Sequence, residues 1–114
     1  MTEHHVVNSI CNQFNLTHNE LRSQSRKTHL VDARQSCALA LRKLGKTYKY
    51  IANIVNRKDH TTIMHLVKRR SHNWRNNERI AHETVKAYED MASSKIKTYK
   101  VNVEEFLEMV QQIN

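Results

Sequence analysis

The sequence predicts an all-α protein, and three observations support this prediction. The 114 residues include one glycine and no proline, so the tight turns that join the strands of an all-β fold have almost nothing to form them. Helix formers such as Leu, Ala, Lys, Arg, Gln and Glu are abundant. Apolar residues recur at the i, i+3, i+4 and i+7 positions of one helix face. We expect one small helical protein with a single core.

Two helices and a loop are expected in the first thirty residues. The first helix carries an apolar face made of Val6, Val7, Ile10, Cys11 and Phe14. A short second helix begins at Thr17, because Thr17 and Glu20 fit a capping box. Residues 22–30, with the sequence RSQSRKTHL, are polar and basic without periodicity. They predict a loop, which we call the basic loop.

A longer helix is expected over about residues 33–44. Asp32 and Gln35 fit an N-terminal capping box, and Gly45 can take the left-handed conformation that follows a last helical turn. The inward stripe of this helix consists of Cys37, Ala40, Leu41 and Leu44.

Two shorter helices separated by a polar turn come next. Thr47 caps the first, residues 56–58 form the turn, and Asp59 caps a second helix of about a dozen residues. The buried faces are expected to hold Ile51, Ile54 and Val55 in the first helix and Ile63, Leu66 and Val67 in the second, with Met64 open between inside and outside. Thr61, Thr62, His65 and Arg69 remain available to solvent or a ligand. This is the outline of a helix-turn-helix, although many helical hairpins share it.

The remaining residues predict further helices. An apolar stripe from Ile80 to Met91 predicts a helix that ends near Ser93, residues 95–101 form a linker or short extended piece, and Asn102 caps a last helix. We divide the chain into a unit over residues 1–72 and an extension over residues 73–114. The extension either enlarges the core or forms a surface for a second copy or a protein partner. Trp74 is expected to be a packing anchor between the two.

The positive charge is concentrated in the middle of the chain. With histidine neutral, residues 1–21 carry −2, residues 22–70 carry +11 and residues 71–114 carry −1. The middle segment holds thirteen Lys and Arg against only Asp32 and Asp59. Such one-sided charge favours a polyanion partner, with nucleic acid ahead of an acidic membrane surface.

Several function classes are excluded by the residues present. A single glycine cannot form a P-loop or a Rossmann phosphate turn, and we identify no nucleophile with a neighbouring base, so we expect no enzyme, no catalytic residue and no cofactor. Cys11 and Cys37 belong to no CxxC pair and are expected to be buried thiols in a cytoplasmic protein. His60 and His65 are five residues apart and do not share a helix face, so we expect no metal site. We find no run long enough to span a membrane.

Residues 57–65, RKDHTTIMH, carry a specific resemblance. This segment resembles the signature of the bacterial chromosomal replication initiator (DnaA) family, in that family's C-terminal DNA-binding domain. The likeness covers roughly residues 6–70, including NQFNLTHNEL, the basic loop and the pair Arg34 and Gln35. It implies a Trp-repressor-like helix-turn-helix fold.

The resemblance also implies residue roles. Contacts with bases fall to Asp59, His60, Thr61 and Thr62 at the start of a recognition helix in the major groove, and to Arg26 in the adjacent minor groove. Phosphate contacts fall to Arg34, Arg42, Lys58, Arg69, Lys27 and Arg57. The chemistry suits these roles, because a carboxylate accepts from the cytosine amine, threonine methyls fit thymine methyls, and arginine suits a narrow A·T-rich minor groove.

Some features depart from the family pattern. The initiator's ATPase domain has no counterpart here, so origin opening is not implied, and Ala33 stands where proline is common. The basic loop has fewer lysine and arginine residues than is usual in the family.

We expect a stand-alone protein of a bacterial or phage-infected cell that binds a specific duplex site and regulates replication initiation or transcription. We expect no membrane or nucleotide partner. The alternative is an adaptor in which residues 73–114 bind a protein partner and the basic face adds nonspecific DNA affinity.

Overall fold

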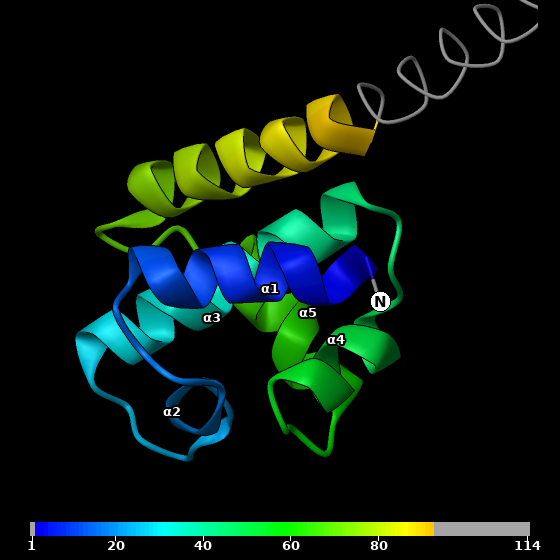
Figure 1. The fold of residues 1–114 in the computed structure, drawn as a ribbon. Coiled ribbons are helices and arrows are strands. Elements are labelled where there is room, and N and C mark those ends of the chain that lie inside the picture. Colours follow the sequence, from blue (N-terminus) through cyan, green and yellow to red (C-terminus); the bar gives the residue numbers. More distant parts are fainter. Residues whose placement is uncertain (1, 93–114) are drawn as a thin grey trace, which may run out of the picture.

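The computed structural model describes residues 2–92, with side chains from residue 4 onward. The labelled helices are α1 (Thr2–Gln13), α2 (His18–Arg22), α3 (Thr28–Lys43), α4 (Tyr48–Ile54) and α5 (His60–Lys68). A further helix, which we call the C-terminal helix, covers residues 74–92 (Figure 1). The described part of the chain contains helices and no strands, which confirms the predicted all-α class.

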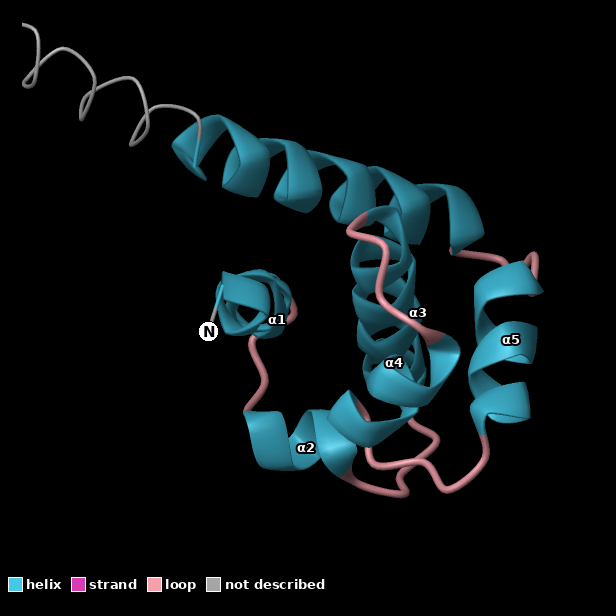
Figure 2. Cartoon of the chain, turned by 90° about the vertical axis from the view of Figure 1, so that its right-hand side faces the viewer, coloured by secondary structure: helices cyan, strands magenta, loops and turns pink. Residues whose placement is uncertain are grey.

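Helix α3 is the centre of the arrangement. It packs against α1, α2, α4 and α5, and in Figure 2 it stands between α1 on one side and α5 on the other, with the C-terminal helix crossing above. Every residue of α3 from Ala33 to Leu41 is buried. Small side chains at Ala33, Cys37 and Ala40 allow helices to approach closely from several directions. The central helix is therefore the scaffold on which the other elements are placed.

The predicted helix caps are largely confirmed. The Thr17 hydroxyl accepts a hydrogen bond from the backbone of Glu20, whose carboxylate accepts one from the Thr17 backbone, so the capping box is present. Thr47 and Asp59 cap α4 and α5 with their side chains. Gly45 follows α3 with a φ of +83°, a left-handed conformation that favours glycine. These features depend on neighbouring residues alone, which is why the sequence could predict them.

Two helix boundaries differ from the predictions. Helix α3 begins at Thr28, so the basic loop, which was predicted over residues 22–30, is limited to residues 23–27. Its first turn showed no apolar periodicity because Thr28 and His29 face solvent. Asp32 lies inside the helix and is not its cap; Lys27 is the N-cap residue, without a side-chain hydrogen bond. Helix α5 has nine residues and not about a dozen, because Arg69 turns to an extended conformation.

The described part of the extension shares the core of the preceding residues. Ala81 and Val85 belong to the same cluster of buried apolar side chains as α1 and α3, and the Gln13 side chain donates to the Thr84 hydroxyl over 2.9 Å. The predicted stripe is buried at Ala81, Thr84 and Val85, whereas Met91 is exposed. Residues 73–92 thus enlarge the core. The predicted linker over residues 95–101 and the last helix lie outside the described residues.

Cys11 and Cys37 are free and buried, as predicted. Burial raises the pKa of the Cys37 thiol to about 12, with the neighbouring Cys11 adding to the effect, and burial raises the pKa of Cys11 as well. Both side chains therefore act as small apolar groups at neutral pH. Within residues 2–92, every helix is too short or too polar to cross a membrane.

Candidate nucleic-acid interface

A sharp turn between α4 and α5 brings the polar start of α5 to the surface. Asn56 adopts a left-handed conformation with a φ of +58°, which asparagine tolerates better than most residues. The Arg57 backbone then donates to the Ala52 carbonyl over 2.7 Å, so the chain reverses direction within a few residues. Helix α5 begins directly afterwards at its cap, Asp59. The predicted helix-turn-helix is formed by these two helices and their turn.

Helix α5 has one buried and one exposed face. Ile63 is fully buried, and Leu66 and Val67 are half-buried against the core. We call residues 59–62 the recognition tip. All four predicted base-contacting side chains of the tip, Asp59, His60, Thr61 and Thr62, are exposed together at the start of the helix.

Asp59 is both a helix cap and a charged acceptor. Its carboxylate accepts from the Thr61 backbone N–H over 2.9 Å. The pKa of Asp59 lies below its usual value, chiefly because the backbone and hydroxyl of Thr61 donate to the carboxylate, with His60 and His65 adding favourable charge. The Asp59 side chain is nevertheless 67% exposed. One carboxylate oxygen can therefore hold the helix while the group remains accessible to a base amine.

Arg34 is placed differently from its predicted role as a phosphate contact. The side chain is only 4% exposed. Its guanidinium donates to the carbonyls of Leu21 at 2.8 Å, Ser25 at 2.6 Å, Ser23 at 2.8 Å and Glu20 at 3.3 Å. These carbonyls belong to α2 and the basic loop. The structure therefore corrects the prediction: Arg34 is a buried clamp that shapes the basic loop, because its charge-assisted bonds replace the water that the loop would otherwise need.

Arg57 joins the basic loop to the helix-turn-helix turn. Its Nη1 donates to the Ser23 carbonyl over 3.2 Å and to the Val55 carbonyl over 3.0 Å. From the end of α2, Arg22 Nη1 donates to the Asn53 carbonyl over 2.7 Å. These hydrogen bonds consequently fix the distance between the basic loop and the turn that precedes α5. Arg57 is half-buried, and its role as a phosphate contact stays a prediction.

A groove of about 630 Å³ lies between the basic loop, the start of α3 and α5, and we call it the basic groove. Exposed arginine, histidine and hydroxyl side chains on its walls come from the basic loop, α3, α5 and the residue that follows α5: Arg26, Thr28, Thr62, His65 and Arg69. Arg57 and the buried Arg34 also contribute to the wall. Among its lining residues the one carboxylate is that of Asp32, whose two oxygens accept from Asn73 and Asn77.

The arginines of the basic groove lie close enough to affect one another. Burial lowers the pKa of Arg57, and the charge of Arg26 lowers it further. Burial also lowers the pKa of Arg34, with the charge of Arg57 adding to the effect. Such crowding of like charges beside a single, already bonded carboxylate leaves positive potential in the groove. The negative charges of a chain of phosphates would offset this positive potential.

The other predicted phosphate contacts lie outside this groove. Lys27 and Lys58 are exposed in the basic loop and in the α4–α5 turn, respectively. Arg42 lies near the opposite end of α3, where its guanidinium donates to the Lys46 carbonyl over 2.8 Å and stacks 4.2 Å from the centre of the Tyr48 ring. The structure therefore brings Arg26, Arg57 and Arg69 together and leaves Arg42 beside the start of α4.

Sequence reasoning missed two kinds of residue. His65 lines the basic groove, whereas the sequence predicts only that it is available to solvent or a ligand; its place one turn after Thr61 and Thr62 is the signal that could have placed it there. Gln35 contacts the far end of α5, and Asn77 contacts Gln35; no local pattern predicts either contact.

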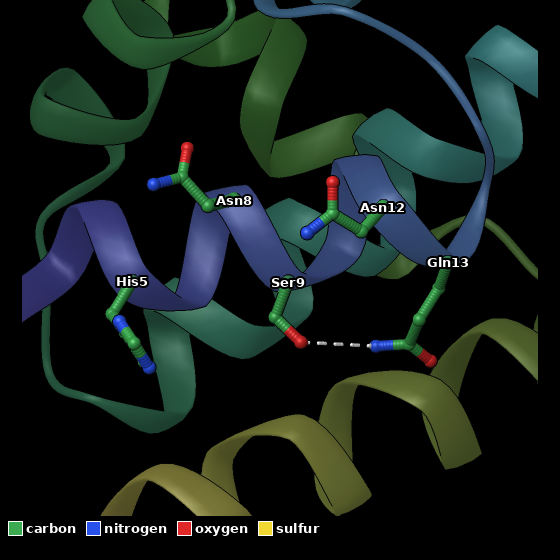
Figure 3. A pocket seen from close by; sticks show the side chains of 5 residues that line it. All are labelled: His5, Asn8, Ser9, Asn12 and Gln13. Atoms are coloured by element: carbon green, nitrogen blue, oxygen red, sulfur yellow. Dashed lines mark hydrogen bonds between the residues drawn. The ribbon is translucent and has the colours of Figure 1, made fainter.

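A second hollow lies on the outer face of α1 and is shown in Figure 3. It is lined by His5, Asn8, Ser9, Asn12 and Gln13, and the Gln13 amide donates to the Ser9 hydroxyl over 3.4 Å. The lining contains no arginine or lysine. The charge that predicts a polyanion partner is therefore gathered on the α5 side and not here.

Comparisons with known proteins agree with this geometry. The model of a protein family described as the bacterial dnaA protein helix-turn-helix matches residues 4–69. This range includes the recognition tip, the basic loop and most of the basic groove. No curated protein and no solved structure matches the chain.

Proposed function

Because the chain belongs to the family of bacterial DnaA helix-turn-helix domains, a family of DNA-binding domains, we propose that it recognises a short, specific sequence of duplex DNA. The observation that carries this proposal is the pairing of an exposed, polar recognition tip with a basic groove along the same helix. Polar side chains at a helix start can read base edges in the major groove, and cations beside them can fix the helix on the backbone.

The recognition tip offers each kind of contact that base readout needs. The Asp59 carboxylate can accept from a cytosine amine, and the methyl groups of Thr61 and Thr62 can pack on thymine methyls. His60 offers a ring nitrogen as donor or acceptor. Together these groups discriminate between base pairs through different chemistry at successive positions. The preferred site is therefore a short and asymmetric box.

The basic groove indicates where the sugar–phosphate backbone runs. A major groove and the adjacent minor groove are separated by one backbone strand. If the recognition tip occupies the major groove and Arg26 the minor groove, that strand must pass between α5 and the basic loop. The basic groove occupies this interval, with Arg69 and Thr62 on one wall and Arg26 on the other. Arginine also suits the enhanced negative potential of a narrow minor groove.

We propose that regulation occurs by occupancy of the DNA site. The one glycine of the sequence cannot build a phosphate-binding loop for ATP, so the proposed activity requires no nucleotide. A protein of this kind acts by occupying its box and by competing there with a full-length initiator or another DNA-binding protein. It would thereby regulate replication initiation or transcription.

Selection of bound sites from random duplex DNA tests the proposal. The selected box and a scrambled duplex of equal length and composition are then compared at one fixed salt concentration. Specific readout predicts that the box binds about 10³-fold or more tightly. An affinity ratio near one would reject base readout and favour the adaptor alternative, in which the basic face binds DNA without sequence preference.

A further inference from the structure

The C-terminal end of α5 is held by a single buried side chain of α3. Gln35, which is 2% exposed, donates from Nε2 to the carbonyl of Leu66 over 3.0 Å and to that of Arg69 over 2.8 Å. These carbonyls lie at the end of the recognition helix, where carbonyl groups lack helical partners. The Oε1 atom of Gln35 accepts from the Ser71 hydroxyl over 3.2 Å and from Asn77 Nδ2 over 2.8 Å.

Asn77 connects this side chain to the C-terminal helix. The side chain is fully buried, and its Nδ2 donates to Asp32 Oδ1 over 3.0 Å as well as to Gln35. The second oxygen of Asp32 accepts from Asn73 over 2.8 Å. The Oδ1 atom of Asn77 is buried without a hydrogen-bond partner. Asn77 is therefore used here for its N–H groups alone.

This pattern determines which way the Gln35 amide faces. The amide has a donor end and an acceptor end of nearly the same shape. Because Asn77 presents an N–H group and the α5 carbonyls can only accept, the Gln35 oxygen faces Asn77 and its NH₂ group faces the carbonyls. The Ser71 hydroxyl, which can donate or accept, donates here. The reverse orientation would place three carbonyl oxygens together and set the Gln35 NH₂ group against the Asn77 N–H, away from water.

We propose that Asn77 is a positioning residue for DNA recognition: by orienting the Gln35 amide, it holds the C-terminal end of α5 and thereby aims the recognition tip. This inference rests on the proposed function. Asn77 lies on the C-terminal helix, beyond the residues 4–69 that match the family. The segment outside the family match consequently contributes to base readout without touching DNA.

The test exchanges the donor for an acceptor and includes a matched control. In N77D, a carboxylate faces Asp32 and the Gln35 oxygen, which favours reversal of the Gln35 amide and repulsion of the α5 carbonyls. N76D makes the same chemical change one residue earlier, where the side chain is exposed and its oxygen already accepts from Arg79 over 2.8 Å. N76D therefore controls for the introduction of a carboxyl group at this point of the chain, and N77A controls for any proton taken up by the buried carboxyl of N77D.

Both variants are measured on the selected box and on scrambled duplex, at a temperature where circular dichroism shows them folded. We expect N77D to reduce the affinity ratio between the two duplexes about tenfold, a loss comparable to that of one base contact, and N76D to stay within about twofold of the original protein. Equal ratios for the two variants would overturn the proposal. If N77D does not fold, N77A is compared with V85A, which removes buried methyl groups from the same helix away from the network.

A spectroscopic measurement separates this inference from the proposed function. The Gln35 side-chain NH₂ protons should exchange slowly with solvent in the original protein and in N76D, and faster in N77D or N77A. If the original protein shows no preference for any box, the proposed function fails, and the exchange rates still decide whether Asn77 orients Gln35. Unchanged exchange in folded N77D or N77A would refute that role.

Discussion

The two ends of α5 are built in opposite ways. At its start, Asp59 and His60 have side chains that are 67% and 60% exposed, and the side-chain support of the first turn is the Asp59 cap. At its end, Gln35 and Asn77 are almost completely buried and connect the helix to two other elements. The comparison separates two tasks. In the proposed function, the exposed end carries the chemistry that meets DNA, and the buried end determines where that chemistry lies.

The same division applies to the two elements that flank the basic groove. Arg34 and Gln35 are neighbours on α3, and each is buried with its polar atoms bonded to a different element. Arg34 binds the carbonyls around the basic loop, and Gln35 binds those at the end of α5. Two adjacent residues of the scaffold thus support the two walls of the groove. Substitutions of buried supports should change stability, whereas substitutions of exposed contacts should change binding alone.

The largest effect is expected for R34A. This change removes one donor from each of four carbonyls of α2 and the basic loop, and it removes a side chain that is 4% exposed. The carbonyls of Ser23 and Glu20 keep their bonds from Arg57 and Ser23. Unsatisfied buried groups are costly, so we expect the free energy of unfolding to fall by about 4 kcal/mol, measured by urea denaturation. R34K should recover only part of this loss, because an ammonium cannot reproduce the planar fork of guanidinium.

The opposite result for R34A would change the interpretation of the structure. If stability fell by less than about 1 kcal/mol while affinity for both specific and scrambled DNA dropped, Arg34 would be a phosphate contact after all. The clamp described above would then not be its main role.

A somewhat smaller effect is expected for I63A, on the buried face of α5. Ile63 is fully buried in the core cluster, and removal of its outer carbons leaves a cavity. We expect a loss of about 3 kcal/mol in the free energy of unfolding. T62A, on the exposed face of the same turn, should change stability by no more than about 0.5 kcal/mol. Equal losses for the two variants would contradict the assignment of the two faces.

Local sequence patterns were enough to predict the exposed end of α5. A cap depends on one side chain and the next three residues, so Thr17, Thr47 and Asp59 were identified correctly. The apolar spacing around Ile63 showed which face of α5 is buried, and the exposed face follows from it. The sequence alone therefore predicts that the recognition tip lies at the surface.

The buried supports could not be predicted in this way. The Arg34 bonds join residues nine to fourteen positions apart, and those from Gln35 to α5 and Asn77 span 31 to 42 positions. Asp32 fitted a capping box with Gln35, and the structure instead uses both side chains for long-range contacts. A single sequence carries no record of such pairings, and the family resemblance, which implies a phosphate contact for Arg34, does not reveal the carbonyls that its guanidinium binds.

For the exposed end, T61A should affect binding without affecting folding. Alanine keeps the backbone N–H that donates to Asp59, so the helix cap is preserved. Loss of the hydroxyl and methyl should weaken binding to the selected box by about 1–3 kcal/mol and leave scrambled duplex almost unaffected. Fluorescence anisotropy on both duplexes measures the difference, and the unfolding free energy should change by no more than about 0.5 kcal/mol. Equal losses on both duplexes would mean that Thr61 does not read bases.

The smallest effect is expected for K58Q, because Lys58 is exposed beside the recognition tip and offers charge without directional chemistry. One lost phosphate contact should reduce the steepness of log affinity against log salt by about one unit on both duplexes. R79Q is the matched control, since Arg79 is equally a surface cation but already pairs with Glu83 on the C-terminal helix. Its slope should remain that of the original protein.

The slope of log affinity against log salt decides this prediction, and affinity at a single salt concentration does not. The slope counts the counterions displaced by the protein and is insensitive to which bases lie beneath the tip. A change of slope for R79Q as large as that for K58Q would show that DNA also reaches the C-terminal helix, and that the exposed end of α5 is not the boundary of the interface.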